Sequence, residues 1–159
     1  MRYSHHMNKQ LTFLLSLTLL FLVGCKTVGV NDNQSKDYTE EVRLHRLSAE
    51  QGNVKGQINL GVMYFNGHGV QQDYKEAVKW FRLSADQGFS LGQYNLGVMY
   101  TNGQGVSVNY LLAYKWFNLS AANGNENANF YRNKLEEVMS QSQIKKAQEM
   151  ARNWKPETR

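Results

Sequence analysis

The sequence predicts an all-α fold built as a solenoid of helix pairs. From residue 37 the chain repeats itself with a period of 36 residues, and residues 46–81 and 82–117 are identical at 23 of 36 aligned positions. The chain has a single proline among 159 residues, which suits a mostly helical protein. Each unit contains two stretches of helical periodicity joined by a glycine turn. Stacked copies of such a unit bury one continuous core, so the repetition predicts a solenoid.

The first helix of the first unit is expected to run from about Asn53 to Phe65. Leu60 and Tyr64 fall at helical spacing within this segment. Gly67 follows it, and glycine readily takes the left-handed conformation in which many helices end. The pattern predicts a helix that stops at the glycine turn and recurs one repeat later.

The second helix of each unit is expected to open at a capping residue. Asp73 lies three residues before Glu76, which is the spacing of a capping box. Asp37 and Glu40 have the same spacing in the preceding half unit. Asn109 occupies the corresponding position in the second full unit and can also cap a helix. These residues predict helix starts near residues 37, 73 and 109.

Each copy contains a glycine-x-glycine sequence, Gly67-x-Gly69 and then Gly103-x-Gly105. A phosphate-binding loop would need a strand before it, further glycines or a Lys-Ser/Thr pair, and a helix N-terminus directed at the ligand. These loops join helix to helix and lack those features. We therefore interpret the four glycines as structural turns that recur because the helix pair recurs.

A set of spaced residues characterises the first unit: Leu60, Gly61, Tyr64, Gly67, Gly69, Val70, Asp73, Ala77, Trp80 and Phe81. This pattern resembles the Sel-1-like repeat family, a relative of the tetratricopeptide repeats. The resemblance covers residues 37 to 125 and implies a right-handed α-solenoid of antiparallel helix pairs. It implies an N-terminal half repeat, full repeats at residues 46–81 and 82–117, and C-terminal capping helices.

The C-terminal part, residues 118–154, departs from the repeat and is expected to form a divergent cap. Ser140 and Gln143 have capping-box spacing, so a last helix should run from Gln141 to about Trp154. Residues 155–159 are expected to fray. The residues that suit an apolar face before the last helix are Phe130, Leu135, Val138 and Met139.

The N-terminus is expected to be a lipoprotein signal peptide covering residues 1–24. Residues 11–23 form an apolar run of 13 residues, shorter than the roughly 20 residues of a membrane-spanning helix. The sequence Leu22-Val23-Gly24-Cys25 resembles the lipobox of bacterial lipoproteins, which implies lipid attachment at Cys25. The alternative is a free or buried thiol. Residues 25–35 then form a flexible tether before a solenoid at 36–154, and both Met1 and Met7 remain candidate starts.

The lipobox resemblance implies a lipid-anchored protein of the bacterial cell envelope. Lys26 follows the cysteine, where an aspartate in enteric lipoproteins would favour retention in the inner membrane. The expected location is therefore the outer membrane, facing the periplasm, although the sequence leaves inner membrane and surface exposure open.

Charge and residue content exclude several functional classes. The net charge is +5, and without the leader residues Arg2 and Lys9 it falls to +3, which is too mild to indicate nucleic-acid binding. A single cysteine excludes an intramolecular disulfide and a thiol zinc cluster. No Ser/His/Asp set, carboxylate pair or HExxH motif can be assembled. We expect no catalytic residues, no metal and no cofactor.

The positions that differ between the two copies indicate a binding surface. At about 100° per residue, the varying pairs Lys55/Leu91, Ile58/Tyr94 and Phe65/Thr101 share one stripe, and Val62 and Val98 lie in the same stripe. An overlay on tetratricopeptide repeats places this stripe on the concave inner face. The alternative is that these side chains pack on neighbouring helices. The candidate partner-binding residues are Lys55, Ile58, Val62, Phe65, Asn66, Leu91, Tyr94, Val98, Thr101 and Asn102.

The expected function is a non-catalytic protein-interaction module, a scaffold or adaptor that binds an envelope or host protein or peptide on the concave face. One alternative is a β-lactam-binding or hydrolysing envelope enzyme, although the relatives with that association are cysteine-rich. A second alternative is a periplasmic regulator of signalling or exopolysaccharide export. The sequence identifies no partner.

Overall fold

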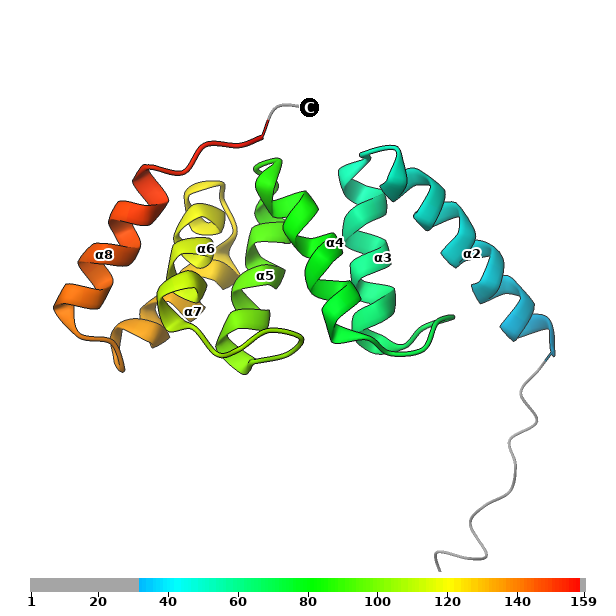
Figure 1. The fold of residues 1–159 in the computed structure, drawn as a ribbon, viewed down its shortest axis with the longest axis horizontal. Coiled ribbons are helices and arrows are strands. Elements are labelled where there is room, and N and C mark those ends of the chain that lie inside the picture. Colours follow the sequence, from blue (N-terminus) through cyan, green and yellow to red (C-terminus); the bar gives the residue numbers. More distant parts are fainter. Residues whose placement is uncertain (1–31, 158–159) are drawn as a thin grey trace, which may run out of the picture. The chain divides into compact units, whose positions relative to one another are not determined.

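The computed structural model describes the backbone of residues 32–157 and the side chains of residues 38–157. This part of the chain consists of helices without a strand, and residues 36–159 form one compact unit. The predicted all-α repeat solenoid is confirmed (Figure 1). Residues 1–31, including the expected signal peptide and Cys25, lie outside the described residues. The helices are α2 (Asp32–Glu50), α3 (Val54–Asn66), α4 (Tyr74–Asp86), α5 (Ser90–Asn102), α6 (Tyr110–Ala122), α7 (Glu126–Glu136) and α8 (Gln141–Arg152).

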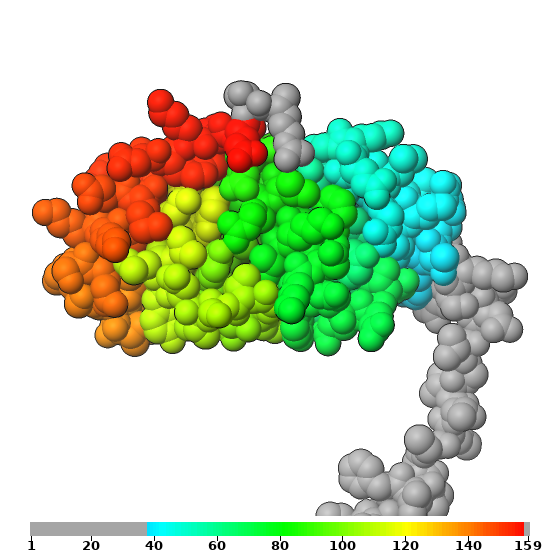
Figure 2. Space-filling model, in the orientation of Figure 1, coloured from blue at the N-terminus to red at the C-terminus, as the bar shows by residue number. Residues whose placement is uncertain are grey.

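Successive helices pack against one another from α3 to α7, and α8 packs back on α6. Figure 2 shows this order as consecutive bands of colour across the unit.

Glycines allow the two helices of each pair to approach closely. A Cβ atom added at Gly61 would lie 2.6 Å from the Phe81 ring, and one at Gly97 would lie 2.7 Å from the Phe117 ring. The two phenylalanines therefore pack directly on the backbone of α3 and α5.

Buried glutamines link each helix pair to the next one. Gln57 and Gln93 are almost completely buried, and each donates a hydrogen bond of 3.4 Å to a backbone carbonyl of the preceding helix. Gln87 then donates to the side-chain oxygen of Gln57 at 2.8 Å, and Asn123 donates to Gln93 at 3.3 Å. Buried amides are costly without partners, so this recurring contact stabilises one stacking register.

The second helices of the two full repeats start after the predicted capping residues, and the first helix of the first repeat is capped by Asn53, its expected start. Asn53 accepts a hydrogen bond from the Gly56 N–H, and Asp73 accepts from the N–H groups of Lys75 and Glu76. Asn109 accepts from the Leu112 N–H. These side chains satisfy N–H groups that have no partner within the first helical turn.

The four turn glycines join the first helix of each unit to the second and have φ angles from 69° to 73°. They are Gly67, Gly69, Gly103 and Gly105. Gly69 also lies against the preceding helix, where an added Cβ would be 2.9 Å from the carbonyl oxygen of Tyr38. Both the left-handed backbone and the close packing favour glycine at this position.

The N-terminal boundary differs from the expectation. Helix α2 begins at Asp32, so residues 32–35 of the expected tether are helical and Asp37 lies inside a helix rather than at its N-cap. No glycine or proline interrupts the sequence from Asp32 to Glu50, and nothing therefore stops the helix at the repeat boundary. Glu40 pairs with Arg43 at 2.7 Å instead of completing a capping box.

The C-terminal cap agrees with the expectation at its last helix and differs before it. The capping box between Ser140 and Gln143 is present, and α8 ends at Arg152. Of the expected apolar face, Leu135 and Met139 are buried. Phe130 and Val138 are 59% and 67% exposed, so only part of the predicted apolar face is buried.

Residues 154–157, which include part of the segment expected to fray, contact the repeats. The Trp154 ring makes an edge contact with Trp116 at 5.9 Å between centroids. The N–H of Glu157 donates a hydrogen bond of 2.7 Å to the carbonyl of Asp86. The segment after α8 therefore returns across α6 toward the end of α4, as Figure 1 shows.

Candidate functional site

A hollow of about 220 Å³ lies between α3 and α5, and we call it the inner groove. Val62 and Phe65 of α3 line one side, and Tyr94 and Val98 of α5 line the other. These four residues belong to the predicted stripe, on which Phe65 and Tyr94 differ from their counterparts in the other repeat while Val62 and Val98 are the same. The groove is mainly apolar, and its remaining lining residues are Phe81, Asn95 and Met99.

The groove-lining side chains point away from the helix pairs because the opposite faces of α3 and α5 are buried within those pairs. Leu60 and Leu96 are fully buried, with 0% exposure. Successive helical residues are rotated by about 100°, so Val62 lies about 200° from Leu60 and points away from the core of its own pair. Val62 is 37% exposed as a result. The hydrophobic periodicity that buries Leu60 thus also determines the direction of the groove wall.

The predicted stripe residues differ in accessibility. The exposed ones are Lys55, Val62, Asn66, Leu91 and Asn102. The half-buried ones are Phe65, Tyr94, Val98 and Thr101. Ile58 is buried, with 7% exposure, so its inclusion on an accessible stripe was wrong. Sequence variation between repeats therefore does not by itself mean exposure, because the shorter Ile58 stays buried where its counterpart Tyr94 reaches the surface.

The two repeats make unequal contributions to the groove. Phe65 lines it and contacts the Tyr74 ring, with 5.5 Å between the centroids. Its counterpart Thr101 donates its hydroxyl to the Gly97 carbonyl at 2.9 Å and is not part of the lining. At this position of the repeat, α3 therefore contributes an aromatic ring to the groove, and α5 contributes no side chain.

Tyr94 has both a surface and a packing role. It lines the inner groove, and its ring lies 6.0 Å from Phe117 and 5.9 Å from Tyr131 between centroids. Burial, and then the neighbouring Tyr131, raise the pKa of the Tyr94 phenol. The alternative in which the stripe packs on neighbouring helices is therefore partly correct at this residue.

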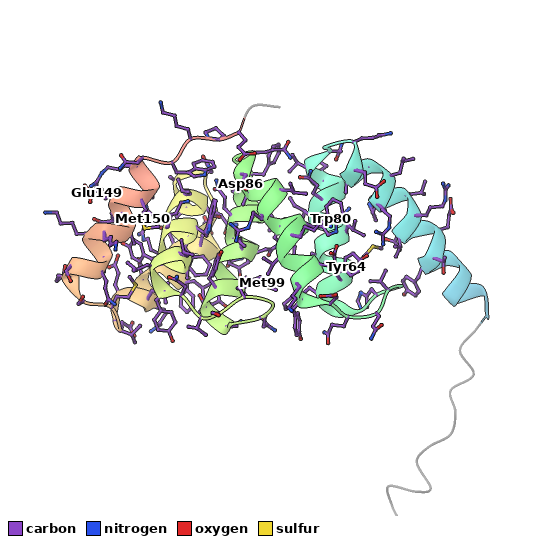
Figure 3. The ribbon with its side chains drawn as sticks, viewed as in Figure 1. Tyr64, Trp80, Asp86, Met99, Glu149 and Met150 are labelled. Carbon is purple, nitrogen blue, oxygen red and sulfur yellow. The ribbon has the colours of Figure 1, made fainter. Side chains whose placement is uncertain are left out.

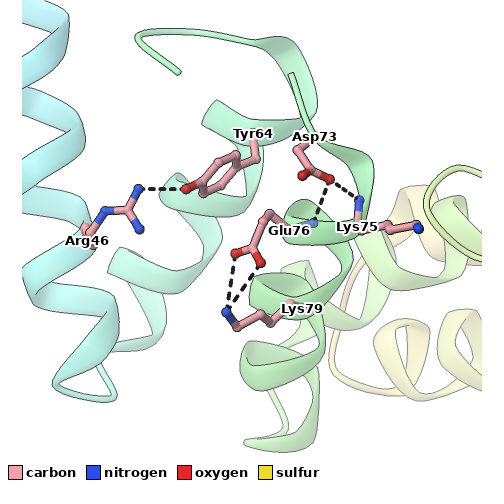
Figure 4. A network of polar contacts seen from close by, with 6 residues as sticks. All are labelled: Arg46, Tyr64, Asp73, Lys75, Glu76 and Lys79. Carbon is pink, nitrogen blue, oxygen red and sulfur yellow. Dashed lines mark hydrogen bonds and ion pairs between the residues drawn. The ribbon is translucent and has the colours of Figure 1, made fainter. Parts of the chain in front are cut away.

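A second, larger hollow of about 490 Å³ lies beside the turn between α3 and α4. Figure 4 shows the polar contacts around it. Arg46 donates a hydrogen bond of 2.6 Å to the Tyr64 hydroxyl, and Lys79 pairs with Glu76 at 3.4 Å. The lining residues are Tyr64, Val70, Gln71, Gln72, Asp73 and Glu76.

The polar groups of this second hollow stabilise the turn. The Asp73 side chain accepts from two N–H groups of α4, and its own N–H donates to the Tyr64 carbonyl at 3.0 Å. Because that N–H is already bonded, Glu76 does not complete the expected capping box and pairs with Lys79 instead. These contacts account for the acidic side chains as structural residues.

Residues 38–157 contain no group of three His, Cys, Asp or Glu side chains placed to hold a metal ion. His68 stacks on Tyr38, with centroids 6.5 Å apart.

Within the described part of the chain, no helix is both long enough and apolar enough to span a bilayer.

Three residues of the inner groove were missed in the sequence. Asn95 and Met99 (Figure 3) are identical to Asn59 and Met63 of the first repeat, so a search for positions that differ between the repeats does not select them. Phe81 comes from α4 and reaches the groove by packing across Gly61. Asn95 follows Tyr94 on the same helix, so the sequence could have indicated that Asn95 lies near the groove. The contribution of Phe81 could not be predicted in this way, because it depends on a contact between two helices.

Comparison with known families identifies the repeated unit. The Sel1 repeat matches residues 54–89 and 90–125. The chain carries two Sel1 repeats. The first matched segment contains α3 and α4, and the second contains α5 and α6. The units proposed from the sequence have the same period and begin eight residues earlier.

Solved structures containing such repeats are similar to this Sel1-repeat chain. One is c5321, described as a protective antigen present in uropathogenic Escherichia coli strains and displaying an SLR fold; it is 32% identical, with a TM-score of 0.71 over 73% of this chain and 25% of that one. Another is a Sel1 repeat protein from Oxalobacter formigenes, 33% identical, with a TM-score of 0.55 over 57% of this chain and 37% of that one.

The chain therefore spans between a quarter and two fifths of the length of these two structures. No curated protein matches its sequence. The comparisons identify the repeat and the solenoid fold. Sel1-repeat proteins are in general protein-interaction modules.

Proposed function

We propose that this chain is a non-catalytic interaction module that binds a polypeptide segment in the inner groove between α3 and α5. The observation that carries the proposal is the coincidence of two independent features. Phe65 and Tyr94 were selected because they differ from their counterparts in the other repeat, and the unchanged Val62 and Val98 because they lie on the same stripe. These four side chains line one hollow. Apolar side chains around a surface hollow are typical of sites that receive an anchor residue of a partner.

The size of the groove favours an amino-acid side chain over a cofactor. Its volume of about 220 Å³ is below the roughly 300–1,000 Å³ of small-molecule pockets. Its lining offers one amide, from Asn95, among apolar and aromatic side chains. Burial of an apolar anchor there would contribute about 25 cal/mol for each Å² of apolar surface removed from water.

A photo-crosslinking experiment in living cells tests the binding surface. A photoreactive amino acid is placed at Val62 in the groove or at Val108, which is 54% exposed and does not line it. We expect a discrete adduct from position 62 that disappears when Phe65→Ala is combined with it. Equal adducts from both positions, or an adduct indifferent to Phe65→Ala, would show that the groove is not the binding surface.

We further propose that lipid on Cys25 anchors the protein in the bacterial cell envelope, at the outer membrane and facing the periplasm. The lipobox-like sequence after an apolar run of 13 residues supports this location. The similarity to c5321, a protective antigen, fits a protein at the cell boundary. Mass spectrometry of the mature N-terminus should find a diacylglyceryl group on Cys25, and Cys25→Ala should release the protein from membranes. An intact leader with an unmodified thiol contradicts the anchor.

A further inference from the structure

The binding face continues beyond the two matched repeats onto α7. With the repeat period of 36 residues, Phe130 occupies the position of Tyr94, and Tyr131 occupies the position of Asn95. Phe130 is 59% exposed and Tyr131 is 39% exposed. Single exposed apolar side chains are ordinary on a protein surface and do not by themselves indicate a contact. Their position on the groove-lining stripe is the informative point.

A continuous series of ring contacts connects these residues to the inner groove. The Tyr94 ring, which lines the groove, lies 5.9 Å from Tyr131, and Tyr131 lies 5.5 Å from Phe130. Tyr131 also stacks on the buried Phe117, with centroids 5.6 Å apart and planes 20° apart. Phe117 holds Tyr131 in place, and Tyr131 in turn supports the exposed Phe130 ring from its edge.

These distances limit the length of segment that can reach both places. Two ring contacts of 5.9 and 5.5 Å place the Phe130 centroid no more than about 11 Å from that of Tyr94. An extended polypeptide advances about 3.3 Å per residue, so about four residues bridge the groove and the Phe130 ring. One short segment with two apolar side chains can therefore contact both.

The charges of this face favour an acidic partner over a basic one. Helices α3 and α5 together contain one charged residue, Lys55, and no carboxylate. Among residues 38–157 no ion-pair partner faces Lys55, whereas Lys134 on α7 is paired with Glu137 at 2.8 Å. The N-terminus of α5 also has no side-chain cap hydrogen bond at Phe89, and the positive end of a helix dipole favours an anionic neighbour.

We propose that the partner is a short polypeptide segment with two apolar anchors and acidic flanking residues, one anchor seated in the inner groove and the other on Phe130. This inference rests on the proposed function and extends it to α7. Phe130 is a second contact site supported by Tyr131, and Lys55 sets the charge preference. A basic segment with the same apolar spacing binds more weakly because it meets Lys55 and the α5 N-terminus with like charge.

A library of random dodecapeptides displayed on phage provides the probe. The full chain, purified in mild detergent, is used for selection, and the affinity of the best enriched peptide is then measured by fluorescence anisotropy. The enriched peptides should contain two apolar residues separated by no more than four positions and flanked by Asp or Glu. Phe130→Ala should weaken binding by about tenfold or more, as expected for an aromatic contact residue. Tyr110→Ala is the matched control, because Tyr110 is an aromatic residue of α6 that is 43% exposed and does not line the groove.

The outcomes separate this inference from the proposed function. If Tyr94→Ala weakens binding but Phe130→Ala resembles Tyr110→Ala, the groove binds and the extension to α7 is wrong. If no peptide is enriched, or if neither Tyr94→Ala nor Val62→Glu affects binding, both fail. Exchanging the acidic flanks of the peptide for lysine should reduce its affinity for the chain. Lys55→Ala should make the difference in affinity between the acidic and the lysine peptide smaller. If Lys55→Ala leaves this difference unchanged, the charge assignment is wrong. Circular dichroism of each variant verifies that α7 remains folded.

Discussion

The guanidinium of Arg46 on α2 donates a hydrogen bond to the Tyr64 hydroxyl on α3, with 2.6 Å between the two atoms. The same pair recurs one repeat later, where Arg82 on α4 donates to Tyr100 on α5. In both pairs the guanidinium carbon also lies within 6 Å of the tyrosine ring centroid. The repetition shows that this contact belongs to the stacking of one helix pair on the next.

Removing one member of the repeated pair should destabilise the stack. Tyr100→Phe keeps the ring but loses the hydroxyl, and Arg82→Ala loses both the hydrogen bond and the cation–π contact. In a double-mutant cycle measured by urea unfolding, we expect a coupling free energy of about 1 kcal/mol. Arg43→Ala, which removes an exposed pair with Glu40, should have the smaller effect. Additive effects of the Arg82 and Tyr100 changes would show that the contact contributes nothing.

A helical glycine should prove essential for packing. Gly97→Ala would raise helix propensity by about 1 kcal/mol in an exposed helix. Here the added methyl group would lie 2.7 Å from the Phe117 ring, which is fully buried. We therefore expect a net loss of about 1–3 kcal/mol in the free energy of unfolding, from overpacking. Phe117→Leu should be less harmful in the Gly97→Ala background than alone. Stabilisation by Gly97→Ala would contradict the close contact.

Alkaline pH should weaken the C-terminal cap through Tyr114. Burial, and then its hydrogen bond of 2.7 Å to Glu136, raise the pKa of the Tyr114 phenol. The folded state therefore holds this proton more tightly than the unfolded state. The corresponding stability is fully present below the unfolded pKa of about 10 and is lost as pH rises through the folded pKa. Guanidinium unfolding at several pH values should show a decline that is smaller in Tyr114→Phe; equal declines would refute the assignment.

The segment after α8 should stabilise the solenoid. Trp154 makes an edge contact with Trp116, and Glu157 bonds the carbonyl at the end of α4. Trp154→Ala should lower the free energy of unfolding by about 1–2 kcal/mol and change the fluorescence of Trp116. Lys155→Ala at the neighbouring exposed position is the control. Identical melting curves for the two variants would mean that the tail is not part of the fold.

The repeat explains why the central helices could be predicted. Two copies of one pattern identify α3 to α6 and the glycine turns, because each position has an independent second example. Asp73 and Asn109, for instance, occur at the same place and cap the same helix of each pair. Four residues of the inner groove could also be selected, because position around a helix follows directly from residue number.

The ends of the solenoid could not be predicted in the same way. The start of α2 at Asp32 and the contact of Trp154 with Trp116 have no second copy to compare. The exposure of Phe130 depends on how α7 and α8 pack on α6, which is a contact between distant segments. The burial of Ile58 depends likewise on its neighbours, whereas periodicity gives only its direction.

The central claim is that the inner groove binds a polypeptide, and the most direct measurement compares two substitutions of one kind. Val62→Glu places a charge in the groove, and Val108→Glu places the same charge at an exposed site outside it. Both positions are accessible, so both variants should keep the fold and thermal stability of the parent. Affinity for a peptide selected on the parent chain should fall by about tenfold or more in Val62→Glu and remain unchanged in Val108→Glu. Equal affinities in the two folded variants would contradict the account.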